Sequence, residues 1–132
     1  MPCEPFQVRP PDSGAVLFRV VENVPAAEED LLSDEQAGKH RDLLMSAALY
    51  RGFSCRATLN QARSLGRLLE DQRGRKQYVA ELVLEAEEGD GVARTFKTRG
   101  HHTVWTDAAL AILRVRHVHD VWDYPDHERS VT

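Results

Sequence analysis

The sequence predicts a single α+β domain with a mixed or antiparallel sheet and three to four helices. With 132 residues, the chain is long enough to bury a core without metals or disulfides. Hydrophobic residues make up 42% and charged residues 29%, close to ordinary globular usage. Segments of strand and helix periodicity follow the order β-α-α-β-α-β-β-α-β, which has too few strand-helix-strand units for a doubly wound parallel sheet. We expect the domain to span residues 15–122, between a flexible Pro-rich leader at 1–14 and a polar tail at 123–132.

The first expected strand covers residues 15–21, where the sequence AVLFRVV is almost entirely apolar. Arg19 is its one charged interruption. A short acidic helix is predicted next, with Asn23 as the capping residue and Pro25 in the first turn.

Two further helices and a short strand are expected before the middle of the chain. Ser33 and Gln36 have the spacing of a capping box, which predicts a second helical turn there. Residues 40–49 place leucine and alanine side chains on one side of a helix. The segment 50–57, YRGFSCRA, is typical of a short strand in which Gly52 permits an unusual backbone angle.

The clearest element of the chain is a helix at residues 59–72. Thr58 and Gln61 form a capping box, and apolar side chains then recur at helical spacing. Two alternating segments follow at 77–86 and 92–98, separated by a turn sequence. They predict a β-hairpin.

The last third of the chain predicts a loop entering a strand, a brief helix and a final strand. Asp107 is placed to cap a helix that runs through Ala111. Residues 112–122 then alternate in the manner of a strand.

The densest group of polar side chains lies in the segment RGHHTVW. Arginine and imidazole groups can hold an anion there, and a tryptophan can stack on a ring. The candidate ligand-binding residues of this segment are Arg99, His101, His102, Thr103 and Trp105. The alternative is a solvated turn that leads into a strand whose Val104 and Trp105 belong to the core.

Three more candidate ligand-binding residues, Arg19, Arg51 and Ser54, lie in the first two strand-like segments. A guanidinium group in either segment can clamp a phosphate. Equally, Arg19 can pair with a carboxylate such as Glu81 or Glu85, or point from an edge strand into solvent.

His117 and His119 are the candidate metal ligands. They are two residues apart on the last expected strand and therefore face the same way. A site there needs a third ligand, which His101 or His102 can supply only if their strand is the neighbour of the last one. Paired strand histidines without such a ligand are surface or sheet residues, so we expect no metal, and no motif calls for a cofactor.

Charge, hydropathy and cysteine content narrow the class of protein. The formal net charge of -4 does not favour nucleic acid or an anionic membrane as a partner. No apolar run approaches the ~20 residues of a membrane-spanning helix. Cys3 and Cys55 have no metal-binding spacing, and we expect free thiols in a cytoplasmic protein, although a bridge between them stays possible. The sequence leaves the oligomeric state open.

The stretch RGHHTVWTDAALAIL, together with the opening strand LFRVV, resembles small uncharacterised proteins of GC-rich bacteria that share a G-H-x-T-x-W signature. This resemblance implies no activity. Arg19, Ser54 and Glu81 or Glu85 also stand in an order that resembles the ADP-ribosyltransferase superfamily. There a strand Arg or His, a Ser-containing motif and a later Glu form an NAD site. The Ser-Thr-Ser and Gln/Glu-x-Glu motifs of that superfamily are absent from this sequence.

The sequence favours a small intracellular bacterial binding or accessory module for a protein partner or a small ligand, not itself catalytic. The reason is that no catalytic set is complete. The alternative is an NAD- or nucleotide-processing enzyme resembling ADP-ribosyltransferases, which would use Arg19, Ser54 and the RGHHT segment. Whether the chain catalyses a reaction, and which ligand or partner it binds, is left open by the sequence.

Overall fold

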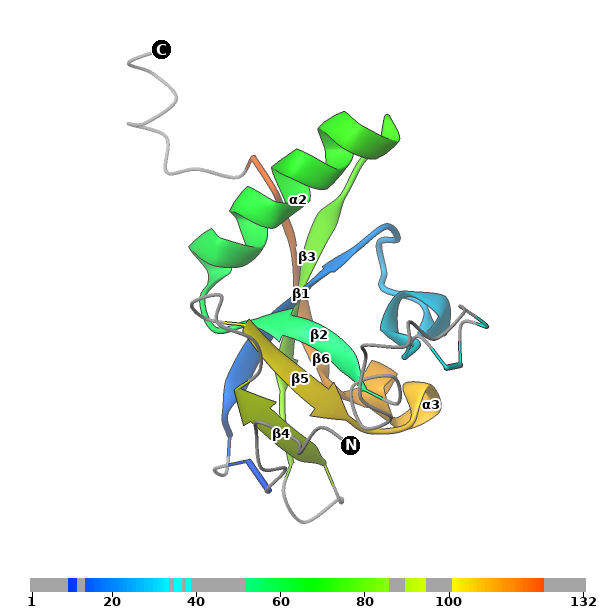
Figure 1. Ribbon diagram of the computed structural model, residues 1–132, viewed down its shortest axis with the longest axis vertical. Helices are drawn as coiled ribbons and strands as arrows, with labels where there is room; N and C mark the ends of the chain where they lie inside the picture. Colours follow the sequence, from blue (N-terminus) through cyan, green and yellow to red (C-terminus); the bar gives the residue numbers. More distant parts are fainter. Residues whose placement is uncertain are drawn as a thin grey trace, which may run out of the picture.

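The computed structural model describes residues 10–11, 14–33, 35–36, 38, 52–85, 90–94 and 101–122. In this part of the chain, one sheet of six strands has the order β4-β5-β2-β1-β3-β6, and every neighbouring pair is antiparallel (Figure 1). The strands are β1 (Val16–Val21), β2 (Phe53–Arg56), β3 (Tyr78–Val83), β4 (Gly91–Arg94), β5 (His101–Trp105) and β6 (Val115–Asp120). The predicted α+β class is confirmed, and the sheet is antiparallel.

The expectation of three to four helices is corrected by the described residues. They contain two α-helices, α2 (Leu59–Arg73) and α3 (Ala108–Ala111), and the short 3-10 helices η1 (Glu28–Leu31) and η3 (Ile112–Arg114). The helix expected at 40–49 lies outside the described residues, as do the tail at 123–132 and most of the leader at 1–14. None of the helices described is long and apolar enough to cross a membrane.

The acidic segment after β1 forms a single 3-10 turn because side-chain hydrogen bonds hold it in a compact loop. The carboxylate of Asp30 accepts hydrogen bonds from the backbone N–H groups of Glu22 and Ala27, at 2.8 and 2.9 Å. It also accepts one from the side chain of Asn23, at 3.0 Å. Asn23 therefore closes this loop, and the residue that precedes the turn as its cap is Ala27.

The long helix begins and ends where the sequence predicts. The Thr58 hydroxyl accepts a hydrogen bond from the Gln61 N–H at 3.1 Å, and the Gln61 side chain accepts one from the Thr58 N–H at 3.2 Å. This reciprocal pair satisfies two backbone donors that a helix start leaves without partners. The helix ends at Gly74, whose φ of 65° is the left-handed conformation that glycine adopts at little cost.

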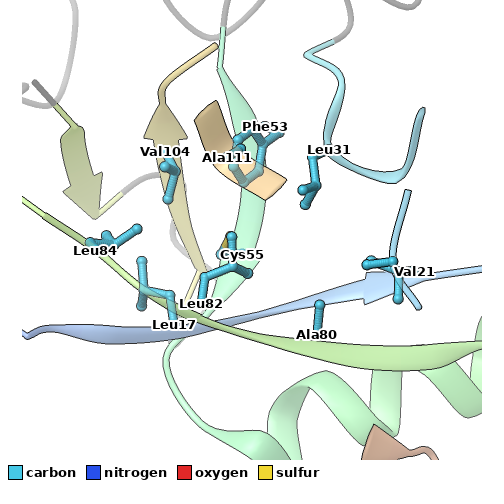
Figure 2. Packing of buried hydrophobic residues seen from close by; sticks show 11 residues of the cluster. Leu17, Val21, Leu31, Phe53, Cys55, Ala80, Leu82, Leu84, Val104 and Ala111 are labelled. Atoms are coloured by element: carbon cyan, nitrogen blue, oxygen red, sulfur yellow. The ribbon is translucent and has the colours of Figure 1, made fainter. Parts of the chain in front are cut away.

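Two layers of helix cover the two faces of the sheet. On one face α2 packs on β1 and β3, where Ala62 and Val79 are buried together with Val121. On the other face η1 and α3 cover the larger core, which includes Leu31, Leu82 and other residues of β1, β2, β3 and β5. Figure 2 shows these side chains on the side of the sheet opposite to α2.

The predicted hairpin of the alternating segments at 77–86 and 92–98 is wrong. β3 lies between β1 and β6, whereas β4 pairs with β5 at the other end of the sheet. Both sides of β3 are already occupied, so β4 cannot add to it. The last strand is also shorter than expected, because residues 112–114 form η3 before β6 begins.

Candidate functional site

The sheet opens between its two central strands. β1 pairs with β3 along its whole length, but its pairing with β2 is recorded at Phe18 and Arg56 alone (Figure 1). A cleft of about 300 Å³ lies at this opening. We call it the β1–β2 cleft; its walls come from β1, the η1 segment, β2 and α2.

Arg19 joins three of these walls. Its Nη1 donates a hydrogen bond to the carbonyl oxygen of Ser54 at 2.7 Å, and its Nε donates one to the carbonyl oxygen of Asp30 at 2.7 Å. Its guanidinium carbon also lies 4.9 Å from the centre of the Phe53 ring. Arg19 therefore fixes the position of β2 and η1 relative to β1.

Of the alternatives for Arg19, pairing with Glu81 or Glu85 is not what the structure shows. Arg19 lies opposite Ala80 in the sheet, so Glu81 projects from the other face. There the Glu81 carboxylate binds Arg116 and His119 instead. Glu85 is exposed beyond the end of β3.

Arg56 has incomplete hydrogen bonding on the β2 side of the cleft. Its Nη1 is buried and has no hydrogen-bond partner among the described residues. Burial lowers the pKa of Arg56, and Cys55 beside it supplies no neutralising charge at neutral pH. Burial raises the pKa of the Cys55 thiol to about 12, so this free, buried cysteine stays protonated.

The carboxylates along the cleft are held by groups other than Arg56. Asp30 accepts the three hydrogen bonds that close the loop after β1. The Glu22 side chain accepts a hydrogen bond from Gln77 at 3.1 Å and lies 3.5 Å from the Nε of Arg75. Positive charge in the cleft is therefore least compensated at its β2 end, beside Arg56.

Arg56 was not among the predicted site residues, although the sequence carries a signal for it. In YRGFSCRA, Arg56 alternates with Ser54 and follows a buried Cys55, so it projects from the same face as Ser54 at the end of an apolar strand. In the same segment, the sequence pattern predicted Arg51 and Ser54 as ligand-binding residues. Ser54 lines the β1–β2 cleft, and Arg51 lies outside the described residues.

The described candidates of the RGHHTVW segment lie on β5, next to β2 but away from the cleft lining. His101 lies opposite Arg56 and Thr103 opposite Ser54. Both are buried, as is Val104, whereas His102 projects from the opposite face and is partly exposed, and Trp105 is also partly exposed. Arg99 lies outside the described residues. The structure thus brings Arg19 and Ser54 together at the cleft and places the β5 residues behind it.

Close packing between β2 and β5 leaves no room for a side chain at Gly52, the residue before β2. A Cβ added at Gly52 would collide with the methyl group of Thr103 and would lie 3.0 Å from Nε1 of Trp105. Gly52 is therefore needed for this close approach.

The two histidines of β6 face the same way, as predicted. The ring centres of His117 and His119 are 4.4 Å apart, and Nε2 of His119 lies 2.9 Å from Oε1 of Glu81. The hydrogen bond with His119, and next those from Arg116, lower the pKa of Glu81 against the opposing effect of its burial.

A third metal ligand from β5 is ruled out by the sheet order. β2, β1 and β3 separate β5 from β6, so neither His101 nor His102 can reach the β6 histidines. Across the described ranges, no group of three or more His, Cys, Asp or Glu side chains is arranged to hold a metal ion.

Comparison of the chain with protein-family models, with curated proteins and with solved structures gives no match.

Proposed function

We propose that the chain is a binding module for a small anionic ligand, which docks in the β1–β2 cleft with its phosphate or carboxylate beside Arg56. The observation that carries this proposal is the Nη1 of Arg56, which is buried without a hydrogen-bond partner among the described residues. Leaving such a donor unsatisfied costs about 1–3 kcal/mol or more when the group is charged. An anionic oxygen that reaches Nη1 from the cleft, after the groups that shield this atom from solvent move aside, supplies the missing acceptor, so binding recovers that cost.

The walls of the cleft indicate the kind of ligand. Phe18, Leu65 and Leu69 give it apolar surface, and Ser54 adds a polar group near Arg56. Its volume of about 300 Å³ lies at the small end of ligand sites, which run from roughly 300 to 1,000 Å³. A mononucleotide or a sugar phosphate therefore suits the cleft better than a whole dinucleotide. Arginine also forms paired hydrogen bonds with phosphate oxygens.

The proposal is tested by measuring thermal unfolding and binding calorimetry with inorganic phosphate, ribose 5-phosphate, AMP, ADP-ribose and NAD. At 100 times its dissociation constant, a ligand adds about 2.7 kcal/mol to the free energy of unfolding. We expect AMP or ribose 5-phosphate to raise the melting temperature. Arg56→Ala should weaken that binding at least tenfold, because it removes the unsatisfied donor.

The matched control is Arg116→Ala, which removes an arginine of β6 that is bound to Glu81 of β3, away from the cleft. It should leave the affinity unchanged. If none of the five compounds binds, or if Arg56→Ala binds as tightly as the unmodified chain, the proposal is wrong.

A second candidate function is NAD or nucleotide processing. It is favoured by the hydrogen bond between Arg19 and the carbonyl of Ser54 at the cleft, since these are two of the residues that resemble the ADP-ribosyltransferase pattern. Neither Glu81 nor Glu85 lines the cleft. Release of nicotinamide from NAD by the unmodified chain, lost in Arg19→Ala, would favour the enzyme over the binding module.

A further inference from the structure

In the part of the chain that the structure describes, the outer side of β6 is an edge of the sheet. β6 is the last strand in the sheet order, and its recorded partner is β3. Strands at such an edge present backbone N–H and C=O groups that can pair with one more strand. Many proteins bind extended peptides in this way, with main-chain hydrogen bonds giving affinity and side-chain pockets giving specificity.

One face of this edge carries an apolar groove. The groove has a volume of about 460 Å³ and is lined by the loop after β1 and by η3 and β6. Val24 is 58% exposed at its rim, and Ile112, Val115 and Val118 line it where they pack against the core. Arg116 and His117 of β6 also border it. Every second side chain of an added strand would project over this groove, which therefore selects apolar residues at those positions.

The other face of the edge is basic. Arg116 and His117 are both exposed, and His119 lies beside them. The pairing register shifts at this point of the strand, and Arg116 turns toward the Glu81 carboxylate on the same side as His119. One carboxylate thus faces one guanidinium and two imidazole groups.

This charge pattern distinguishes between two occupants of the edge. If β6 paired with β6 of a second copy, the Arg116 guanidinium groups of both copies would gather on one face. Like charges placed opposite one another in a sheet are destabilising. Carboxylates on the added strand would instead complement these side chains.

From the groove and the charges we propose that β6 binds an extended segment of a partner protein in which apolar residues alternate with acidic ones, added as a seventh strand beside β6. The apolar residues lie over the groove, and the acidic residues lie beside Arg116 and His117. This surface is separate from the β1–β2 cleft, so it does not depend on the small-ligand proposal.

The experiment uses two labelled eight-residue peptides, one alternating valine with glutamate and the other alternating valine with lysine. Fluorescence anisotropy measures their binding to the full chain. We expect the glutamate peptide to bind at least tenfold more tightly. Arg116→Glu should weaken its binding tenfold or more and strengthen that of the lysine peptide.

His117→Glu provides a second variant that keeps the hydrogen bonds of Glu81 with Arg116 and His119, in case Arg116→Glu unfolds the protein. Arg75→Glu is the matched control, because Arg75 is 69% exposed in the turn before β3 and should leave both affinities unchanged. Equal binding of the two peptides, no binding of either, or loss of binding in Arg75→Glu overturns the proposal. So does a dimer in sedimentation that His117→Glu abolishes, since a second copy would then occupy the edge.

Discussion

Three arginine side chains of this protein differ in how their guanidinium groups are hydrogen-bonded. Arg114 forms a buried ion pair with Asp90, with the Nε to Oδ2 distance at 2.7 Å. Arg19 donates to two backbone carbonyl oxygens. Arg56 keeps a buried donor whose acceptor is missing from the described residues. Because a buried guanidinium needs hydrogen bonds to offset its lost hydration, Arg56 is the one of the three that a ligand can satisfy.

Gly66 lets α2 approach the sheet, and we predict that Gly66→Ala destabilises the protein. Alanine gains about 1 kcal/mol over glycine in the middle of a helix. Here, however, the added Cβ would collide with Cγ1 of Val121, a fully buried side chain with little freedom to move. Overpacking of this kind typically costs about 1–3 kcal/mol. Urea unfolding should therefore show a lower free energy of unfolding for Gly66→Ala.

The matched comparison is Gly66→Ala in a Val121→Ala background. There the space is open and the change should be neutral or stabilising. A Gly66→Ala variant more stable than the unmodified chain would contradict the close packing of α2 on Val121.

At the scale of elements, local signals predicted α2, α3 and β1, because each depends on neighbours in the sequence. The Asp107 side chain accepts a hydrogen bond from the Ala109 N–H at 2.9 Å and caps α3 as expected. The predicted capping box of Ser33 and Gln36 also forms. The Gln36 N–H donates a hydrogen bond to the Ser33 hydroxyl at 3.1 Å. The hairpin failed because alternation identifies a strand but not its partner, and successive strands are neighbours in only roughly two thirds of cases.

We predict that Thr58→Ala lowers the free energy of unfolding by about 1 kcal/mol, the usual cost of losing an N-cap side chain. The reason is that the Gln61 N–H at the start of α2 loses its acceptor. Ser64→Ala, at an exposed position within the same helix, is the control and should have no cost. Urea unfolding measures both variants, and equal effects would show that the capping box does not stabilise α2.

At the scale of the whole molecule, the cleft exists because four separate segments meet where β1 and β2 diverge. Sequence reasoning could identify Arg19 as an unusual charge and Ser54 as a neighbour in a strand. It could not place them side by side, since their hydrogen bond spans 35 residues of sequence. The position of β5 beside β2 likewise follows from the sheet order, and this is why the described side chains of this segment, 101–105, lie outside the lining of the cleft.

The response of the whole fold to acid should depend on carboxylates that are stabilised in their charged form. Burial disfavours the charge of Asp90, but hydrogen bonds from Arg114 and from the Glu85 N–H outweigh it and hold its pKa below the ordinary value. The pKa of Glu70 is also lowered, first by the Gln77 N–H. A carboxyl whose pKa is lower in the folded state contributes stability above its unfolded pKa, about 4, and loses it as pH falls through the folded value.

We therefore predict that the free energy of unfolding is constant near neutral pH and falls below about pH 5, with Asp90 responsible for part of the slope. Asp90→Asn removes this titration and leaves the Arg114 guanidinium buried without its carboxylate, a change that typically costs about 3–5 kcal/mol at neutral pH. The variant should thus be less stable at pH 7 and lose less stability on acidification. Urea unfolding from pH 7 to pH 3 measures both effects, with the exposed Glu85→Gln as control. An Asp90→Asn slope as steep as that of the unmodified chain would show that the buried ion pair does not govern acid stability.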